Sequence, residues 1–300
     1  MNVPQEKQFP QGERDFRAMF PDETACVNYL FNTRWPKGFE CPTCKWRDRT
    51  VVPCRTVTCR HCGNRTSLTS GTVMHGTKKK LCAWLLATWW LCKSEGGSSA
   101  KDLQRLLNLS SYQTAWTWMQ KLRTVMAAAD VDPCLGLVEI GSAHVAPAWE
   151  KPERALVIAA AETIYPSGIT GRIRMQVVET LSAVGVRDFL RKAVGSGSSI
   201  VGPRLGPYLN ADKFGSVYVV DADVTNPARI NEIISSFEIW LNKVHRGGVA
   251  VKHLQHYLDE FCFRNNSVIF PDRQAIFTSL LAGCMAGKSK PYRELVSDHG

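Results

Sequence analysis

Residues 41–62 read CPTCKWRDRTVVPCRTVTCRHC, and this stretch decides the fold of the N-terminal part of the chain. It contains two CxxC pairs, Cys41 with Cys44 and Cys59 with Cys62, and 14 residues separate the pairs. Two thiolates three positions apart on a tight turn can bind one face of a metal ion, and a second pair completes a tetrahedral set of sulfur ligands. The spacing therefore predicts a zinc ribbon with a structural zinc ion. Unligated cysteines or two disulfides are the alternative.

Positive charge is concentrated in the first half of the chain. The 300 residues carry a net charge of +10 at pH 7, and residues 1–130 hold 19 Lys and Arg against 10 Asp and Glu. Such a region is typical of nucleic-acid-binding proteins, although a merely soluble basic surface is the simpler alternative. The basic residues predicted to contact DNA are Lys45, Arg47, Arg49, Arg60, Lys78, Lys79 and Lys80.

The cysteine content and the hydropathy indicate a cytosolic protein. Eleven cysteines, four of them at metal-binding spacing, fit a reducing compartment better than a framework of disulfides. The longest apolar run, residues 81–92, has 12 residues. A helix needs about 20 apolar residues to span a bilayer, so we expect no membrane partner.

Three helices are predicted after the ribbon, over residues 81–92, 100–107 and 111–126. The last two are separated by the turn Asn108-Leu109-Ser110, which is the arrangement of a helix-turn-helix with a longer recognition helix. An ordinary helical hairpin is the alternative. The residues expected on the outward, DNA-facing side of the third helix are Gln113, Thr117, Gln120 and Lys121.

The whole chain is predicted to be a multi-domain α+β protein. We expect a loose arm over residues 1–20, a zinc ribbon over 21–76, a helix-turn-helix domain over 77–130 and an α/β domain over 135–290. In the last part, apolar alternation predicts strands and helices that form a mixed sheet flanked by helices. The strands are expected near 136–140, 154–161, 171–178, 199–201 and 216–220.

Several stretches together carry a resemblance to a known family. They are FECPTC, CRHC, TSGTVMHGTKKKLCAWLLATWWL, SSAKDLQRLLNLSSYQTAWTWMQKLR, LVEI and VKHLQHYLDEFCFRNN. With them the chain resembles the bacterial insertion-sequence transposases that have an N-terminal zinc ribbon and a DDE-type catalytic domain, the ISXO-like group. The resemblance implies an RNase H-like fold from about residue 135 onward and binding of DNA ends through the N-terminal part.

The resemblance also implies a carboxylate site for two divalent metal ions, one of which activates the attacking oxygen while the other stabilises the leaving oxygen. At the three expected acidic positions this chain has Gly141, Pro203 and Ser235. None of these side chains can replace a carboxylate at a hard cation. Glu139 is a possible substitute, because it lies two positions before Gly141 on the same strand face. The other nearby acidic residues are Asp212, Asp221, Asp223, Glu232 and Glu238.

The sequence therefore favours a transposase-like protein that binds duplex DNA at transposon-end-like sites without strand-transfer activity. An active DDE-type transposase whose acids align differently is the first alternative, and only this alternative calls for Mg²⁺. A transcriptional regulator that uses the RNase H-like domain for dimerisation is the second. We expect a homo-oligomer in the bacterial cytoplasm, associated with the nucleoid when bound to DNA.

Overall fold

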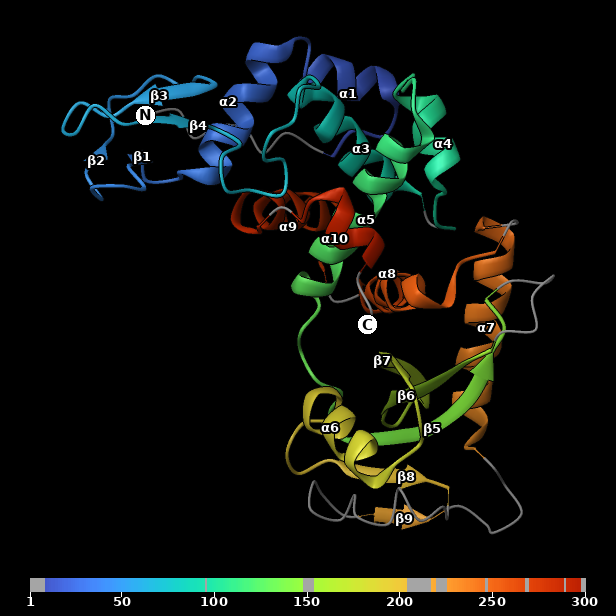
Figure 1. The fold of residues 1–300 in the computed structure, drawn as a ribbon. Coiled ribbons are helices and arrows are strands. Elements are labelled where there is room, and N and C mark those ends of the chain that lie inside the picture. Colours follow the sequence, from blue (N-terminus) through green and yellow to red (C-terminus); the bar gives the residue numbers. More distant parts are fainter. Residues whose placement is uncertain are drawn as a thin grey trace. The chain divides into compact units, whose positions relative to one another are not determined.

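The structure is a computed structural model and describes residues 9–94, 96–147, 154–203, 217–219, 226–245, 248–267, 270–288 and 290–297. The chain forms two compact units (Figure 1). The N-terminal unit is Met1–Val125 with Phe270–Val296, and the C-terminal unit is Met126–Ile269 with Ser297–Gly300. The predicted last domain ran to residue 290, whereas the segment after residue 269 belongs to the N-terminal unit.

The N-terminal unit combines helices with two short hairpins. Asp22 begins one helix by accepting a hydrogen bond from the Ala25 N–H at 2.8 Å, which is an ordinary N-cap. The helices are α1 (Glu13–Met19), α2 (Glu23–Arg34), α3 (Leu81–Lys93), α4 (Ala100–Leu106), α5 (Tyr112–Ala129), α9 (Arg273–Ala286) and α10 (Tyr292–Ser297). The hairpin strands are β1 (Phe39–Glu40), β2 (Arg47–Asp48), β3 (Thr56–Thr58) and β4 (Arg65–Ser67).

The prediction of a loose arm over residues 1–20 is wrong for residues 9–20. Phe9, Phe16 and Phe20 are buried, and Phe16 lies against Trp89 of α3 with ring centroids 5.3 Å apart. Phe9 and Phe20 both contact Phe277 of α9. Burial of each aromatic ring contributes about 1.5–3 kcal/mol, enough to hold a segment whose composition is otherwise polar.

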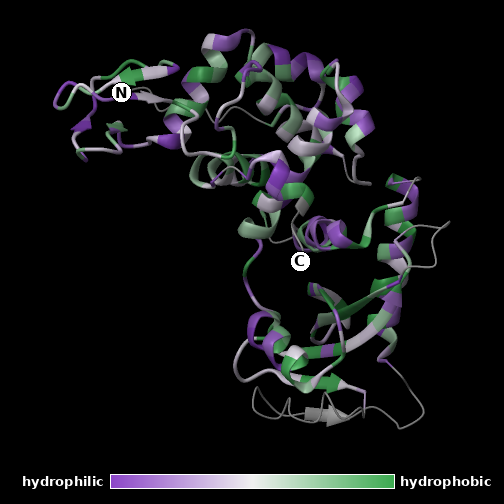
Figure 2. Ribbon diagram, viewed as in Figure 1, coloured by the Kyte–Doolittle hydropathy of each residue, from purple (hydrophilic) through white to green (hydrophobic). Residues whose placement is uncertain are grey.

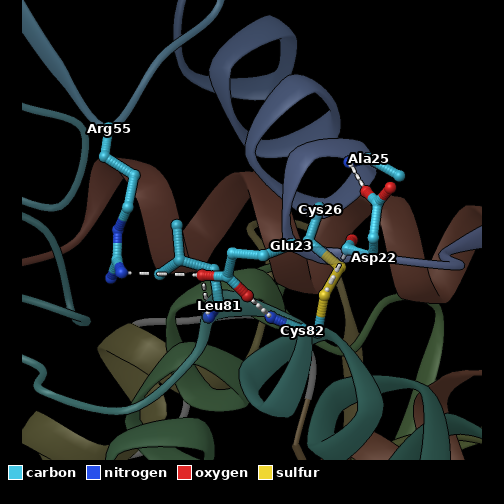
Figure 3. The surroundings of a disulfide bond; sticks show 7 residues. All are labelled: Asp22, Glu23, Ala25, Cys26, Arg55, Leu81 and Cys82. Carbon is cyan, nitrogen blue, oxygen red and sulfur yellow. Dashed lines mark hydrogen bonds and ion pairs between the residues drawn. A yellow bond between two sulfur atoms is a disulfide. The ribbon is translucent and has the colours of Figure 1, made fainter.

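A disulfide joins α2 to the beginning of α3 (Figure 3). It connects Cys26 and Cys82, a single pair that the expectation of a reducing compartment did not include. Beside it, the Glu23 carboxylate accepts hydrogen bonds from the N–H groups of Leu81 and Cys82, and it pairs with Arg55 at 3.6 Å. A carboxylate at a helix N-terminus is favourable because it meets the positive end of the helix dipole.

The C-terminal unit is a five-stranded mixed sheet with the strand order β7-β6-β5-β8-β9. Strands β5, β6 and β7 are antiparallel, and β8 and β9 run parallel to β5. The elements are β5 (Leu137–Val145), β6 (Ala155–Ile164), β7 (Ile169–Val178), α6 (Ala183–Ala193), β8 (Ser199–Gly202), β9 (Val217–Val219), α7 (Ala228–Val244) and α8 (Leu254–Asn266). This confirms the predicted mixed sheet flanked by helices.

Helices cover both faces of the sheet because side chains alternate along its strands. Val138 and Ile140 of β5 point into one apolar layer with Phe189 of α6. Val145 points into the other layer with Phe237 of α7. Figure 2 shows hydrophobic and hydrophilic residues on the same helices, as expected where one helix face is buried and the other is exposed. The alternation places residues 139, 141 and 143 on the α7 face.

Two side-chain amides of α8 pair with the backbone of β7, which is an edge strand. Gln255 accepts from the Val177 N–H at 2.9 Å and donates to the Met175 carbonyl at 3.2 Å. Asn266 accepts from the Ile173 N–H at 2.8 Å and donates to its carbonyl at 2.9 Å. Each carboxamide thus makes the two hydrogen bonds that a neighbouring strand would make.

The buried carboxylate of Asp130 collects donors from β7 and α8. Arg172 donates to it at 2.9 Å, Arg174 at 2.6 and 2.9 Å, and the Asn266 amide at 2.8 Å. The Asp130 side chain is 6% exposed, and the two arginine side chains are 12% and 14% exposed. Charges this deeply buried are stable only when they are paired.

We predict that Asp130→Ala lowers the free energy of unfolding by about 3 kcal/mol, because it removes the buried carboxylate that Arg172 and Arg174 share. Arg172 then retains the exposed carboxylate of Asp132 at 3.2 Å. Asp188→Ala is the matched control. Its carboxylate pairs with Arg191 at 3.7 Å on the exposed side of α6, where a pair contributes less than about 1 kcal/mol. Urea denaturation of both variants measures the difference, and equal losses would contradict the role of Asp130.

Candidate functional site

The four predicted zinc ligands converge. The Sγ atoms of Cys41 and Cys62 lie 3.7 Å apart, those of Cys44 and Cys59 lie 3.6 Å apart, and the four atoms all lie within 4.8 Å of one another. Zinc–sulfur bonds of about 2.3 Å in a tetrahedron separate the sulfurs by about 3.8 Å. The cluster fits a structural zinc ion with four thiolates, which leaves no position open for water.

The two halves of the cluster have the same local backbone. The Lys45 N–H donates to the Cys41 carbonyl at 2.9 Å, and the Gly63 N–H donates to the Cys59 carbonyl at 2.9 Å. Lys45 and Gly63 both have left-handed backbones, with φ of +62° and +70°. A lysine has a steric penalty in this conformation that glycine does not have. The turn is therefore imposed by the geometry that brings each CxxC pair to the metal.

The close approach of the thiols shifts their pKa values in opposite directions. The backbone N–H of Cys44 donates to Cys41 and lowers the pKa of that thiol to about 6. The Trp46 amide acts in the same direction on Cys44, but burial and the neighbouring thiols Cys62, Cys41 and Cys59 raise the pKa of Cys44 to about 12. Four thiolates at this spacing repel one another unless a cation lies among them.

We predict that Cys41→Ser and Cys62→Ser each lose zinc to a chelator that does not strip the unmodified protein. Folding of a ribbon is coupled to the ion, so these variants should also lose the ribbon structure. Cys54→Ser is the control, because the Cys54 thiol lies outside the cluster and donates to the Thr56 carbonyl. Metal analysis of protein purified under reducing conditions makes the comparison. Absence of zinc from the unmodified protein would contradict the assignment.

The basic residues predicted to contact DNA lie at the surface of the N-terminal unit. Two of them have acidic partners, Arg47 with Glu40 at 2.7 Å and Arg60 with Asp48 at 3.6 Å. Both arginines are exposed, and an ion pair at the surface is weak enough to give way to phosphate. The exposed residues are Lys45, Arg47, Arg49, Arg60, Lys78, Lys79 and Lys80.

The outward face predicted for α5 needs correction. Gln113 is exposed, and Thr117 is half-buried with its hydroxyl bonded to the Gln113 carbonyl. Gln120 is completely buried, and the half-buried Lys121 donates to the Val73 carbonyl at 3.2 Å, with burial lowering its pKa. The packed face of α5 is wider than helical periodicity indicated, because neighbours lie on more than one side of it. Of the four, Gln113 has the exposure that a base contact requires.

The parallel pairing of β5 with β8 ends before it reaches the expected acidic positions. Its last pair is Glu139 with Val201, so Gly141 lies two residues beyond it on β5, and Pro203 follows the end of β8. Ser235 is exposed on α7, the helix that packs on this face of β5. The buried face of α7 carries Ile230, Ile234 and Phe237, so the exposed Ser235 lies off that face, and none of the three positions offers a carboxylate.

The space in front of Gly141 is filled by Asn226, which sequence analysis did not identify. A Cβ atom added at Gly141 would lie 2.3 Å from Asn226 Oδ1 and 3.0 Å from Ile230 Cγ2. Asn226 is held there by three hydrogen bonds. It accepts from the Ser142 N–H at 3.0 Å, and it donates to the Ser142 carbonyl at 2.9 Å and to Asn231 Oδ1 at 3.3 Å. Any side chain at position 141 would have to displace it.

The possible substitute Glu139 is already paired. Arg229 donates to Glu139 Oε1 at 3.0 Å, and the same guanidinium bonds the Thr170 hydroxyl at 2.6 Å and the Gly168 carbonyl at 2.9 Å. A carboxylate neutralised in this way is a poor ligand for a divalent cation. Glu232 is exposed, and Glu238 accepts from the Ala146 N–H, just after β5, at 3.4 Å. Asp212, Asp221 and Asp223 lie outside the described residues.

We predict that Gly141→Ala lowers the free energy of unfolding by about 2 kcal/mol through overpacking against Asn226. The loss should shrink by about 1 kcal/mol or more in an Asn226→Ala background, where the space is open. Gly96→Ala is the control, since nothing lies within 4 Å of a Cβ there. Urea denaturation of the four-member cycle measures the coupling. Equal effects of Gly141→Ala in both backgrounds would contradict the filled site.

Comparison with known protein families gives two matches. A model for the ISXO2-like transposase domain matches residues 141–266, and a model for a transposase zinc-ribbon domain matches residues 21–65. No curated protein and no solved structure matches the chain. In the described part of the chain, no helix has the length and apolar character needed to cross a membrane.

Proposed function

Since the chain belongs to the ISXO2-like transposase family, we propose that it binds duplex DNA at transposon-end-like sites without transferring DNA strands. Binding is supported by the basic surface of the N-terminal unit, where the zinc ribbon, Lys78–Lys80 and the exposed Gln113 are the proposed contacts. Lysines and arginines would neutralise phosphates, and a glutamine can pair with an adenine edge. Helix α4, the turn after it and helix α5 are proposed to act together as a helix-turn-helix.

The observation that carries the proposed loss of strand transfer is the filled space at Gly141. Two-metal chemistry needs carboxylates that hold both ions, and here an uncharged amide occupies the place of the first one. The pairing of Glu139 with Arg229 supports the same proposal, since the negative charge of this carboxylate is already balanced by a guanidinium group. The active-transposase alternative requires a carboxylate set built from other residues.

The test begins by selecting bound fragments from random duplex DNA in the absence of Mg²⁺. We expect selective binding whose log K falls steeply with log salt, and no cleavage or joining when Mg²⁺ or Mn²⁺ is added. Replacing Lys78, Lys79 and Lys80 together by Ala should reduce the salt slope by about 0.9 for each phosphate that these lysines neutralise. Lys192→Ala, an exposed lysine on α6, is the control and should leave the slope unchanged.

Three outcomes would contradict all or part of this proposal. Cleavage that depends on Mn²⁺ and disappears in Glu139→Ala would establish an active transposase. An unchanged salt slope in the triple variant would remove Lys78–Lys80 from the interface. Failure to select any DNA fragment would contradict the proposed function as a whole.

A further inference from the structure

The zinc ribbon carries an aromatic pair that the metal site does not use. Trp46 and His61 stack with ring centroids 5.1 Å apart and an angle of 11° between the ring planes. Trp46 is 49% exposed and is the only exposed tryptophan among the described residues. His61 is exposed as well. The ribbon thus exposes a stacked pair of flat rings to solvent.

The zinc cluster holds the backbone that carries both rings. The Trp46 carbonyl accepts from the Cys41 N–H at 2.9 Å, which ties this residue to the first CxxC turn. His61 lies between Cys59 and Cys62, inside the second CxxC turn. The backbone of both residues is therefore ordered by the metal, and the rings stack on each other, which lowers the entropic cost of a contact.

Each ring has basic neighbours in the sequence. Lys45 and Arg47 flank Trp46 in the sequence, Arg60 precedes His61, and all three are exposed. Aromatic faces among basic side chains are the combination that binds single-stranded nucleic acid. An unpaired base has a free face for stacking, whereas a base within a duplex is already stacked on its neighbours. The occupant that fits both the rings and the charges is therefore an unpaired nucleotide.

We propose that Trp46 and His61 form a stacking platform for an unpaired nucleobase of DNA, while Lys45, Arg47 and Arg60 contact the phosphates beside it. This inference rests on the proposed DNA-binding function. It adds that the ribbon binds a single-stranded extension next to duplex DNA, through the faces of its bases rather than through a groove.

The test uses the full-length, zinc-loaded protein and three labelled DNAs measured by fluorescence anisotropy. The first is a blunt duplex recovered by selection from random DNA, the second adds a three-nucleotide overhang, and the third carries abasic sites in the same overhang. The two overhangs have equal charge, so they differ only in the bases. We expect the overhang to bind roughly 5- to 100-fold more tightly than the blunt duplex, and the abasic overhang to lose most of this gain.

Variants assign the gain to the platform. Trp46→Ala should abolish the difference between the overhang and the blunt duplex, and Trp46→Phe should retain most of it. Val52→Ala is the control, because Val52 is 78% exposed on the same ribbon and should leave the difference unchanged. Zinc content is measured for each variant.

Equal binding of the base-containing and abasic overhangs by the unmodified protein would overturn the stacking platform. This comparison needs no variant, so it tests the proposal even if Trp46→Ala loses zinc. A preference that persists in zinc-loaded Trp46→Ala would overturn it as well. If the blunt duplex binds well in either case, the proposed DNA-binding function stands. Absence of binding to all three DNAs would contradict both.

Discussion

The C-terminal unit depends on one buried negative charge, that of Asp130. Its carboxylate accepts hydrogen bonds from Arg172, Arg174 and Asn266, so the outer strand of the sheet and the end of α8 share a single partner. Buried cations and anions must be matched, because an unpaired one costs several kcal/mol. The position of α8 along β7 is thereby set by charge and hydrogen bonding in addition to apolar packing, which alone tolerates sliding.

Patterns that are local in the sequence were sufficient for much of this structure. The spacing of Cys41, Cys44, Cys59 and Cys62 predicted the metal cluster, and apolar alternation predicted the sheet and its flanking helices. Features that depend on distant partners were not predictable. Cys26 and Cys82 are separated by 56 positions and follow no spacing rule, so nothing in the sequence indicated their disulfide. Polar neighbours likewise concealed the buried phenylalanines of the N-terminal segment, whose partners come from α3 and α9.

The same distinction applies to the expected acidic site. Only the resemblance to the transposase family made Gly141 an expected acidic position, since the motif VEIGSA can be read in the sequence. The contact between Asn226 and this position cannot be read there, because residues 141 and 226 are brought together only by the fold. Strand β8 pairs with β5 only through residues 137–139, which leaves the backbone of Ser142 without a strand partner on that side. Asn226 satisfies those groups and fills the space that a missing side chain would otherwise leave empty.

The hydrogen bonds of Gln255 and Asn266 with β7 protect an edge of the sheet against pairing with another chain. An edge strand with free N–H and carbonyl groups is a template on which another chain can add a strand, and proteins commonly prevent this with lysines, prolines or bulges. Here Gln255 and Asn266 occupy the template from the side of α8. Resistance of this edge to aggregation therefore resides in a helix that follows the strand by roughly 80 residues. A partly unfolded chain in which α8 has detached would expose an edge able to recruit a second molecule.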